Sequence, residues 1–117
     1  MGLLQGESEG IYITEEHAVQ NEIRLACTQY AVLFRINVGA VRTPDGRYFE
    51  TGVPKGFSDL FGFRRSDGRA VFIEVKAPKG RIRPEQETFI LSMKKQGALA
   101  GIARCAEDAI KIINGGN

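Results

Sequence analysis

The sequence predicts an α/β fold in which a small mixed β-sheet is flanked by helices on both faces. Three observations lead to this prediction. Segments with helical periodicity occur near the start, in the second half and at the end of the chain. Strand-like apolar segments lie between them, and turns containing proline or glycine separate the segments. Strands grouped between helices in this order are typical of one layered sheet.

The first half of the chain is expected to contain one helix, one strand and a pair of short strands. Thr14 can cap a helix over residues 15–29. The inward side chains of this helix are expected to be Val19, Ile23, Ala26 and Tyr30. The segment AVLFRIN at 31–37 is typical of a strand. In TPDGR at 43–47 the proline fixes φ and the glycine accepts a positive φ, so this turn should join two short strands or extended arms.

The second half is expected to form a hairpin, a crossover helix, a strand and a last helix. The hairpin strands cover 59–64 and 70–77, the crossover helix 84–96, the next strand 98–104 and the last helix 105–113. A helix between two strands allows them to pair in parallel, so the segments 70–77 and 98–104 should be neighbours.

Length and composition fit one soluble domain over residues 1–117, with residues 1–12 and 114–117 frayed. No apolar run approaches the ~20 residues of a membrane helix. The first residues lack the features of a signal peptide, and the two cysteines are expected to be free thiols in an intracellular, cytoplasmic chain. His17 is the only histidine and no CxxC pair occurs, which disfavours a zinc site and a Cys/His or Ser/His nucleophile.

The net charge is only +2, but the charge is unevenly distributed along the chain. Residues 1–41 hold two basic and five acidic side chains, whereas residues 42–95 hold twelve basic and seven acidic ones. The stretch from Lys76 to Arg83 contains four basic residues and no acidic one. Such asymmetry favours a surface that binds a polyanion, and a simple solvated charged face is the alternative.

Glu74 and Lys76 lie in the otherwise apolar segment VFIEVKA. Because strand side chains alternate, both should lie on one face, opposite Val71, Ile73 and Val75. A Glu and a Lys at this spacing are more often an ion pair worth ~0–1 kcal/mol than a catalytic pair. Asp59 changes this interpretation, because the hairpin turn at 65–69 should place it opposite about residue 75, close to Glu74.

Two carboxylates about 4 Å apart repel each other by ~4 kcal/mol at an effective dielectric constant near 20. A divalent cation between them removes that cost, and hard oxygen ligands suit Mg²⁺ or Mn²⁺. Lys76 would then be a fixed ammonium beside the metal, able to orient water or to offset charge on a phosphate.

Asp59 followed by Glu74-Val75-Lys76 resembles the core of the PD-(D/E)XK nucleases. More closely, the chain resembles a stand-alone virus-type replication-repair nuclease (VRR-NUC) domain of phages and prophages. The resemblance is carried by VQNEIRLA at 19–26 and by the stretches 34–62, 72–90 and 97–113. It implies a restriction-endonuclease-like fold with an α-β-β-β-α-β-α core.

The resemblance also implies roles for individual residues. Asp59, Glu74 and the carbonyl of Val75 would bind the metal, and Lys76 would be catalytic. Glu22 on the first helix and Gln86 on the crossover helix would line the same site. From the residues alone, Glu22 is as readily a glutamate at the edge of the core, and Gln86 a capping or solvent residue. The chain departs from the superfamily pattern in two places, with Ser58 before the aspartate and Ile90 where a tyrosine is common.

The expected function is that of a metal-dependent, structure-selective DNA endonuclease, an Mg²⁺- or Mn²⁺-dependent phosphodiester hydrolase with no small-molecule cofactor. The resemblance implies a Holliday-junction resolvase-like homodimer in a phage or prophage host cell. The alternatives are a non-catalytic nucleic-acid-binding subunit of the same fold and a nuclease acting on flaps or RNA.

Basic side chains near the expected site are candidates for DNA contacts. Lys55, Lys79, Arg81 and Arg83 would bind backbone phosphates and read shape and charge rather than bases. Arg42 and Arg47, around the turn at 43–47, would contact DNA farther along, or that segment would serve the dimer interface.

Overall fold

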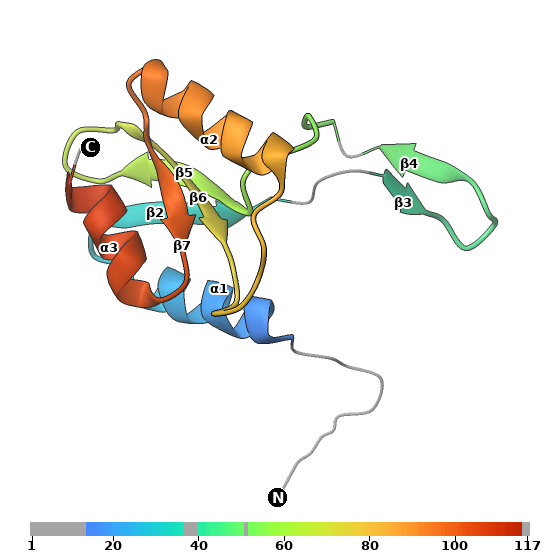
Figure 1. The fold of residues 1–117 in the computed structure, drawn as a ribbon, viewed down its shortest axis with the longest axis horizontal. Coiled ribbons are helices and arrows are strands. Elements are labelled where there is room, and N and C mark those ends of the chain that lie inside the picture. Colours follow the sequence, from blue (N-terminus) through green and yellow to red (C-terminus); the bar gives the residue numbers. More distant parts are fainter. Residues whose placement is uncertain (1–13, 37–39, 51, 116–117) are drawn as a thin grey trace, which may run out of the picture.

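The computed structural model of the chain describes residues 14–36, 40–50 and 52–115 (Figure 1). In chain order the elements are α1 (Glu15–Ala26), β2 (Ala31–Arg35), β3 (Ala40–Arg42), β4 (Tyr48–Glu50), β5 (Leu60–Arg64), β6 (Ala70–Val75), α2 (Pro84–Lys95), β7 (Leu99–Ala103) and α3 (Ala106–Gly115). The expected elements are all present, and most differ from the predicted ranges only at their ends.

Four of the strands form one mixed sheet in the order β2-β5-β6-β7. The β2–β5 and β5–β6 pairs are antiparallel, and β6 pairs in parallel with β7 through the crossover helix α2. The expected α-β-β-β-α-β-α core with a parallel final pair is therefore confirmed. The sheet places the C-terminal end of β6 beside the start of β5, where the chain enters from the loop 52–58.

Helices cover both faces of the sheet (Figure 1). Val71, Ile73 and Val75 are fully buried in a core cluster that α1 and α3 complete. On the other face Phe72 packs with Ile90 of α2 and with a group of phenylalanines around it. The strict alternation along β6 confirms the two faces expected from its sequence, and it leaves Glu74 on the α2 side.

Three of the four side chains expected to face inward from α1 pack on the core: Ile23 is fully buried, and Val19 and Tyr30 are partly buried against it. Ala26 is the exception and is exposed, whereas Gln20 and Cys27 are also buried. The helix starts at the predicted cap, because the hydroxyl of Thr14 accepts a hydrogen bond from the His17 N–H at 3.0 Å. It ends at Ala26, before a turn that leads directly into β2.

A two-stranded arm of β3 and β4 lies apart from the main sheet (Figure 1). Its turn is the predicted one, with Gly46 at φ +90°. The last helix runs to Gly115, so residues 114 and 115 are helical rather than frayed, while residues 1–13 and 116–117 lie outside the described part of the chain. None of the described helices has the length and apolar character required to cross a membrane.

Candidate active site

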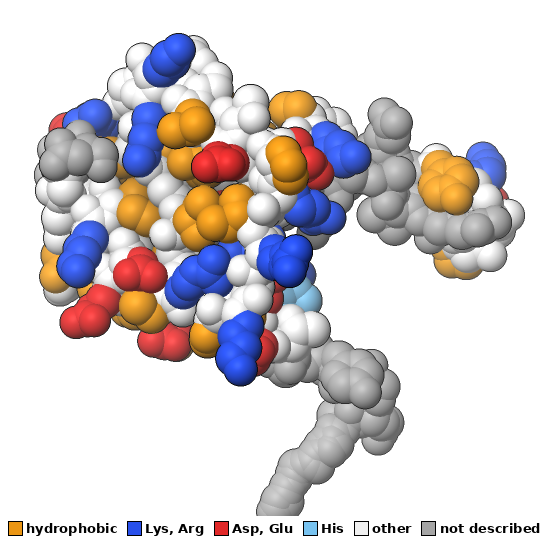
Figure 2. Space-filling view, viewed as in Figure 1, with side chains coloured by type: hydrophobic (Ala, Val, Ile, Leu, Met, Phe, Trp, Pro, Cys, Tyr) orange, Lys and Arg blue, Asp and Glu red, His pale blue; other side chains and the backbone are white. Residues whose placement is uncertain are grey.

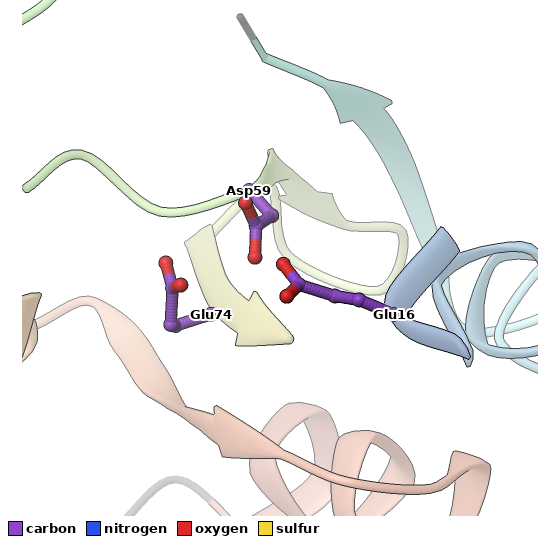
Figure 3. Close-up of side chains that lie close together, drawn as sticks. All are labelled: Glu16, Asp59 and Glu74. Carbon is purple, nitrogen blue, oxygen red and sulfur yellow. The ribbon is translucent and has the colours of Figure 1, made fainter. Parts of the chain in front are cut away.

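Three carboxylates meet at one end of the main sheet (Figure 3). They belong to Glu16 of α1, Asp59 immediately before β5 and Glu74 of β6. One oxygen of each lies within 4.8 Å of the others. Because they come from three separate segments, only the folded sheet and the α1 packing bring them together.

The strand register explains why Asp59 and Glu74 converge. Leu60 pairs with Ile73, so the next step along the two strands sets Asp59 opposite Glu74, one residue from the position expected from the sequence. Two further hydrogen bonds fix Asp59. Its Oδ2 accepts from the Val75 N–H at 2.9 Å, and its carbonyl accepts from the Ile36 N–H at 2.8 Å.

Glu74 is held in a nearly closed environment, with only 1% of the residue exposed. Its Oε2 accepts a hydrogen bond from Gln86 Nε2 at 2.8 Å and lies 3.6 Å from the ammonium of Lys76. The other oxygen, Oε1, is buried and has no hydrogen-bond partner. Gln86 also accepts a hydrogen bond from the Arg83 N–H at 2.9 Å, so it caps α2 and orients Glu74 at the same time.

The site favours protonated carboxyl groups in the metal-free protein. Burial, followed by the neighbouring Asp59 carboxylate, raises the pKa of Glu74 to about 8, against the opposing effect of Lys76. Burial and Asp59 also raise the pKa of Glu16. Negative charge is therefore crowded here beyond what one lysine can balance, which is the electrostatic condition for binding a cation.

The carboxylates lie beside a cavity of about 370 Å³ between α1, the loop 52–58 and the start of α2. Gly56 brings that loop against α2, because a Cβ at this position would lie 2.5 Å from the carbonyl oxygen of Glu85. Basic side chains line the same cavity, namely Arg35, Lys55 and Arg83. Figure 2 shows several Lys and Arg side chains along the edge of the body from which the arm leaves. Carboxylates next to basic side chains suit a phosphate group, because a cation can bridge the carboxylates and the phosphate oxygens.

Glu22 is not among the residues that line this cavity, and Glu16 is the α1 glutamate in the carboxylate cluster. The side chain of Glu22 is exposed, whereas Glu16 is half-buried. Six residues along a helix turn through about 600°, so the two side chains point about 120° apart. Glu16 lies one turn before the buried Gln20, on the side of α1 that faces the cavity.

The basic residues predicted to bind DNA fall into three groups. Lys55 and Arg83 line the cavity, and Lys79 and Arg81 are exposed on the loop between β6 and α2. Arg47 forms an exposed ion pair with Asp45 at 3.0 Å at the tip of the arm. The side chain of Arg42 lies outside the described part of the structure.

The loop 77–80 is held in place by a partly buried contact that the sequence did not indicate. Arg104, directly after β7, donates through Nη1 to the carbonyl oxygens of Ala77 at 2.7 Å and Gly80 at 3.0 Å. A third carbonyl, that of Pro78, accepts at 3.2 Å. Arg104 thereby fixes the segment that joins Lys76 to Arg81.

Five polar or charged residues that line the cavity were not among the predicted site residues: Glu16, His17, Gln20, Arg35 and Glu85. A signal for the α1 members was present in the sequence. Positions 16, 20, 23 and 27 recur at helical spacing, and the first two are polar on a face that is otherwise buried. Polar residues on a buried face indicate a site more directly than the apolar stripe does.

The comparisons with known proteins agree with the geometry. A sequence model of the VRR-NUC domain matches residues 14–107. The chain belongs to the VRR-NUC family. This is a nuclease family whose members generally use divalent metal ions and act on DNA.

A solved structure described as a VRR_NUC domain shares the fold. It is 20% identical in sequence, covers 86% of this chain and 95% of its own, and superposes with a TM-score of 0.59. At that identity the likeness concerns the fold alone. A search of curated protein sequences gave no match.

The residues of this VRR-NUC domain fit a divalent metal ion. Glu16, Asp59 and Glu74 supply hard oxygen ligands at mutual distances that one ion can bridge. The buried Oε1 of Glu74 has no partner within the described protein, and a cation would satisfy it. The N–H of Val75 donates a hydrogen bond to Asp59, so the Val75 backbone lies beside the carboxylates. Metal binding by the Val75 carbonyl stays a prediction.

The raised pKa of Glu74 predicts a pH-dependent loss of stability in the metal-free protein. A carboxyl group whose pKa rises from 4.5 to about 8 on folding makes the protein less stable as the pH increases through that interval. Gln cannot ionise, so Glu74→Gln in EDTA should be more stable than the wild type at pH 8, by on the order of a few kcal/mol. The advantage should vanish near pH 5.

Thermal unfolding in EDTA between pH 5 and pH 9 measures this difference. Glu87→Gln, an exposed position on α2, is the matched control and should change little at any pH. A Glu74→Gln variant whose stability falls with pH in parallel with the wild type would contradict the assignment.

Proposed function

We propose that this VRR-NUC domain is a metal-dependent DNA endonuclease that selects branched DNA, with four-way junctions as its leading substrate and a homodimer as its working form. The observation that carries the proposal is the convergence of Glu16, Asp59 and Glu74, whose oxygens lie within 4.8 Å of one another, beside the buried ammonium of Lys76, 3.6 Å from Glu74. A non-catalytic DNA-binding subunit has no need of a buried acidic cluster paired with a buried lysine, because both are costly to bury.

The residues at the site would have different roles in phosphodiester hydrolysis. Asp59 and Glu74, with Glu16, would hold a Mg²⁺ or Mn²⁺ ion, which when bound supplies Lewis-acid activation of water and of the phosphate. Gln86 keeps the Glu74 carboxylate turned into the cavity through its 2.8 Å hydrogen bond. Lys76 presents its ammonium at the same place, where it can orient the attacking water in line with the leaving oxygen.

Phosphates on either side of the cleaved bond would be bound by the basic residues around the cavity. Arg35, Lys55 and Arg83 line it, and the exposed Lys79 and Arg81 extend the basic surface along the loop before α2. Such contacts to the backbone give affinity without reading bases. Selectivity for branched DNA would then come from the shape of the backbone rather than from its sequence.

The homodimer is proposed from symmetry and from the resemblance to stand-alone family members. A four-way junction has two-fold symmetry and needs two incisions, whereas the described chain holds one carboxylate cluster. Two copies related by a two-fold axis would present two such clusters to the two strands. The β3–β4 arm is a candidate for contact with the second copy or with an arm of the junction.

A cleavage assay on four DNA forms tests the proposed function. Four-way junction, flap, single-stranded and linear duplex DNA are each incubated with the protein in Mg²⁺, in Mn²⁺ or in EDTA. We expect symmetric cleavage of the junction with either metal and none in EDTA. Preferential cleavage of the flap would overturn the junction assignment, and cleavage in EDTA would overturn the metal dependence. A parallel RNA substrate separates DNA from RNA specificity.

Replacing Lys76 should separate cleavage from binding. Lys76→Ala removes the ammonium next to Glu74, and we expect cleavage to slow by at least about 100-fold while junction affinity changes little. Lys95→Ala is the matched control, since it lies at the far end of α2, about 16 Å along the helix from the site. Undiminished cleavage by Lys76→Ala would remove this residue from the mechanism.

The basic loop before α2 should account for part of the salt dependence of binding. Arg81→Ala combined with Arg83→Ala should weaken binding and reduce the slope of log K against log salt by up to about 2. Lys94→Ala combined with Lys95→Ala removes the same charge from the opposite end of α2 and serves as the control. Equal slopes in both double variants would show that Arg81 and Arg83 contribute only to overall charge.

A further inference from the structure

Gln20 is a buried polar residue that the proposed mechanism does not yet use. Only 4% of the residue is exposed, and its Oε1 has no hydrogen-bond partner. Among the described side chains the same is true of one other atom, Oε1 of Glu74. Leaving a buried acceptor unsatisfied costs about 1–3 kcal/mol, so an amide is a poor choice for this position on grounds of stability alone.

Gln20 lines the cavity beside the carboxylate cluster to which Glu74 belongs. Gln20 lies one helical turn after Glu16 on α1, which places the two side chains next to each other on one helix face. Glu16 and Gln20 both line the cavity of about 370 Å³ that also includes Asp59 and Gln86. One and two turns farther along the same face, the buried positions are occupied by the apolar Ile23 and Cys27. The amide is therefore at the point where the buried face of α1 meets the carboxylate cluster.

The two unsatisfied oxygens, Oε1 of Gln20 and Oε1 of Glu74, limit what kind of ligand can occupy the site. Both are acceptors, so what enters must be a cation or carry hydrogen-bond donors. The cavity has room for several water molecules, each of which occupies about 30 Å³ in the liquid. A Mg²⁺ ion usually keeps several of its waters when it is bound through carboxylates, and those waters are strong donors.

We propose that Gln20 is a positioning residue for the cation site: its Oε1 accepts a hydrogen bond from a water on the ion that Glu16, Asp59 and Glu74 bind. The inference rests on the proposed metal-dependent function and adds a residue to it. Gln86 and Gln20 would then have complementary roles: Gln86 donates a hydrogen bond to the Glu74 carboxylate, and Gln20 would accept one from a donor that the cation brings into the cavity.

The test is Mn²⁺ binding by calorimetry in the absence of DNA, on the full chain. Gln20→Met keeps the length of the side chain and removes the acceptor, and we expect Mn²⁺ affinity to fall about 10- to 100-fold. Gln20→Glu restores an acceptor of the same length and should bind Mn²⁺ at least as tightly as the wild type. Gln29→Met, the same change at an exposed position, should leave the affinity unchanged.

Thermal unfolding in EDTA distinguishes positioning from a structural role. Without metal, Gln20→Met should unfold at the wild-type temperature or above it, because the variant no longer buries an unsatisfied acceptor. A clear decrease in that temperature would show that the amide is structural and would overturn the inference.

Asp59→Ala separates failure of this inference from failure of the proposed function. If Asp59→Ala abolishes Mn²⁺ binding while Gln20→Met binds like the wild type, the assignment of Gln20 alone is overturned. If Asp59→Ala also binds Mn²⁺ like the wild type, the cation site itself is misplaced and both proposals fail.

Discussion

The crowding of three acidic groups at one end of the main sheet is the constraint on which the site depends. Glu74 is almost fully buried next to Asp59, and Glu16 approaches from α1. One ammonium group cannot neutralise three carboxylates, so the pocket either takes up protons or binds a divalent ion. Its stability and its affinity for metal are therefore two expressions of the same electrostatic imbalance.

The rest of the fold keeps these groups from moving apart. The antiparallel register sets Asp59 opposite Glu74, and the main chain of β6 holds Asp59 by a hydrogen bond from Val75. The apolar alternation of β6 anchors its other face in the core beneath α1 and α3. Relaxation of the like charges would have to disrupt the central strands, which close packing resists.

The sequence was sufficient for the architecture and for the part of the site that lies on the sheet. Strand periodicity and the hairpin turn determine where Asp59, Glu74 and Lys76 lie, because the register follows from the turn. The sequence was less informative for α1, because tertiary packing decides which face of this helix turns toward the cavity. The apolar stripe predicted the contacts of Val19, Ile23 and Tyr30 with the core. It did not indicate that the buried face also includes the polar Gln20, one turn after Glu16, so Glu16 was not among the predicted site residues. The contact of Arg104 with the loop 77–80 joins residues more than twenty positions apart in the sequence, so no local sequence pattern predicts it.

That contact has a consequence for how a large polyanion would be recognised. A glycine- and proline-containing segment such as 77–80 would, on its own, sample many conformations, and binding would have to restrict them. In the folded protein the guanidinium of Arg104 instead holds three backbone carbonyls of this segment, those of Ala77, Pro78 and Gly80. Lys79 and Arg81 are thus carried on a rigid platform, and little additional chain ordering is left for the encounter.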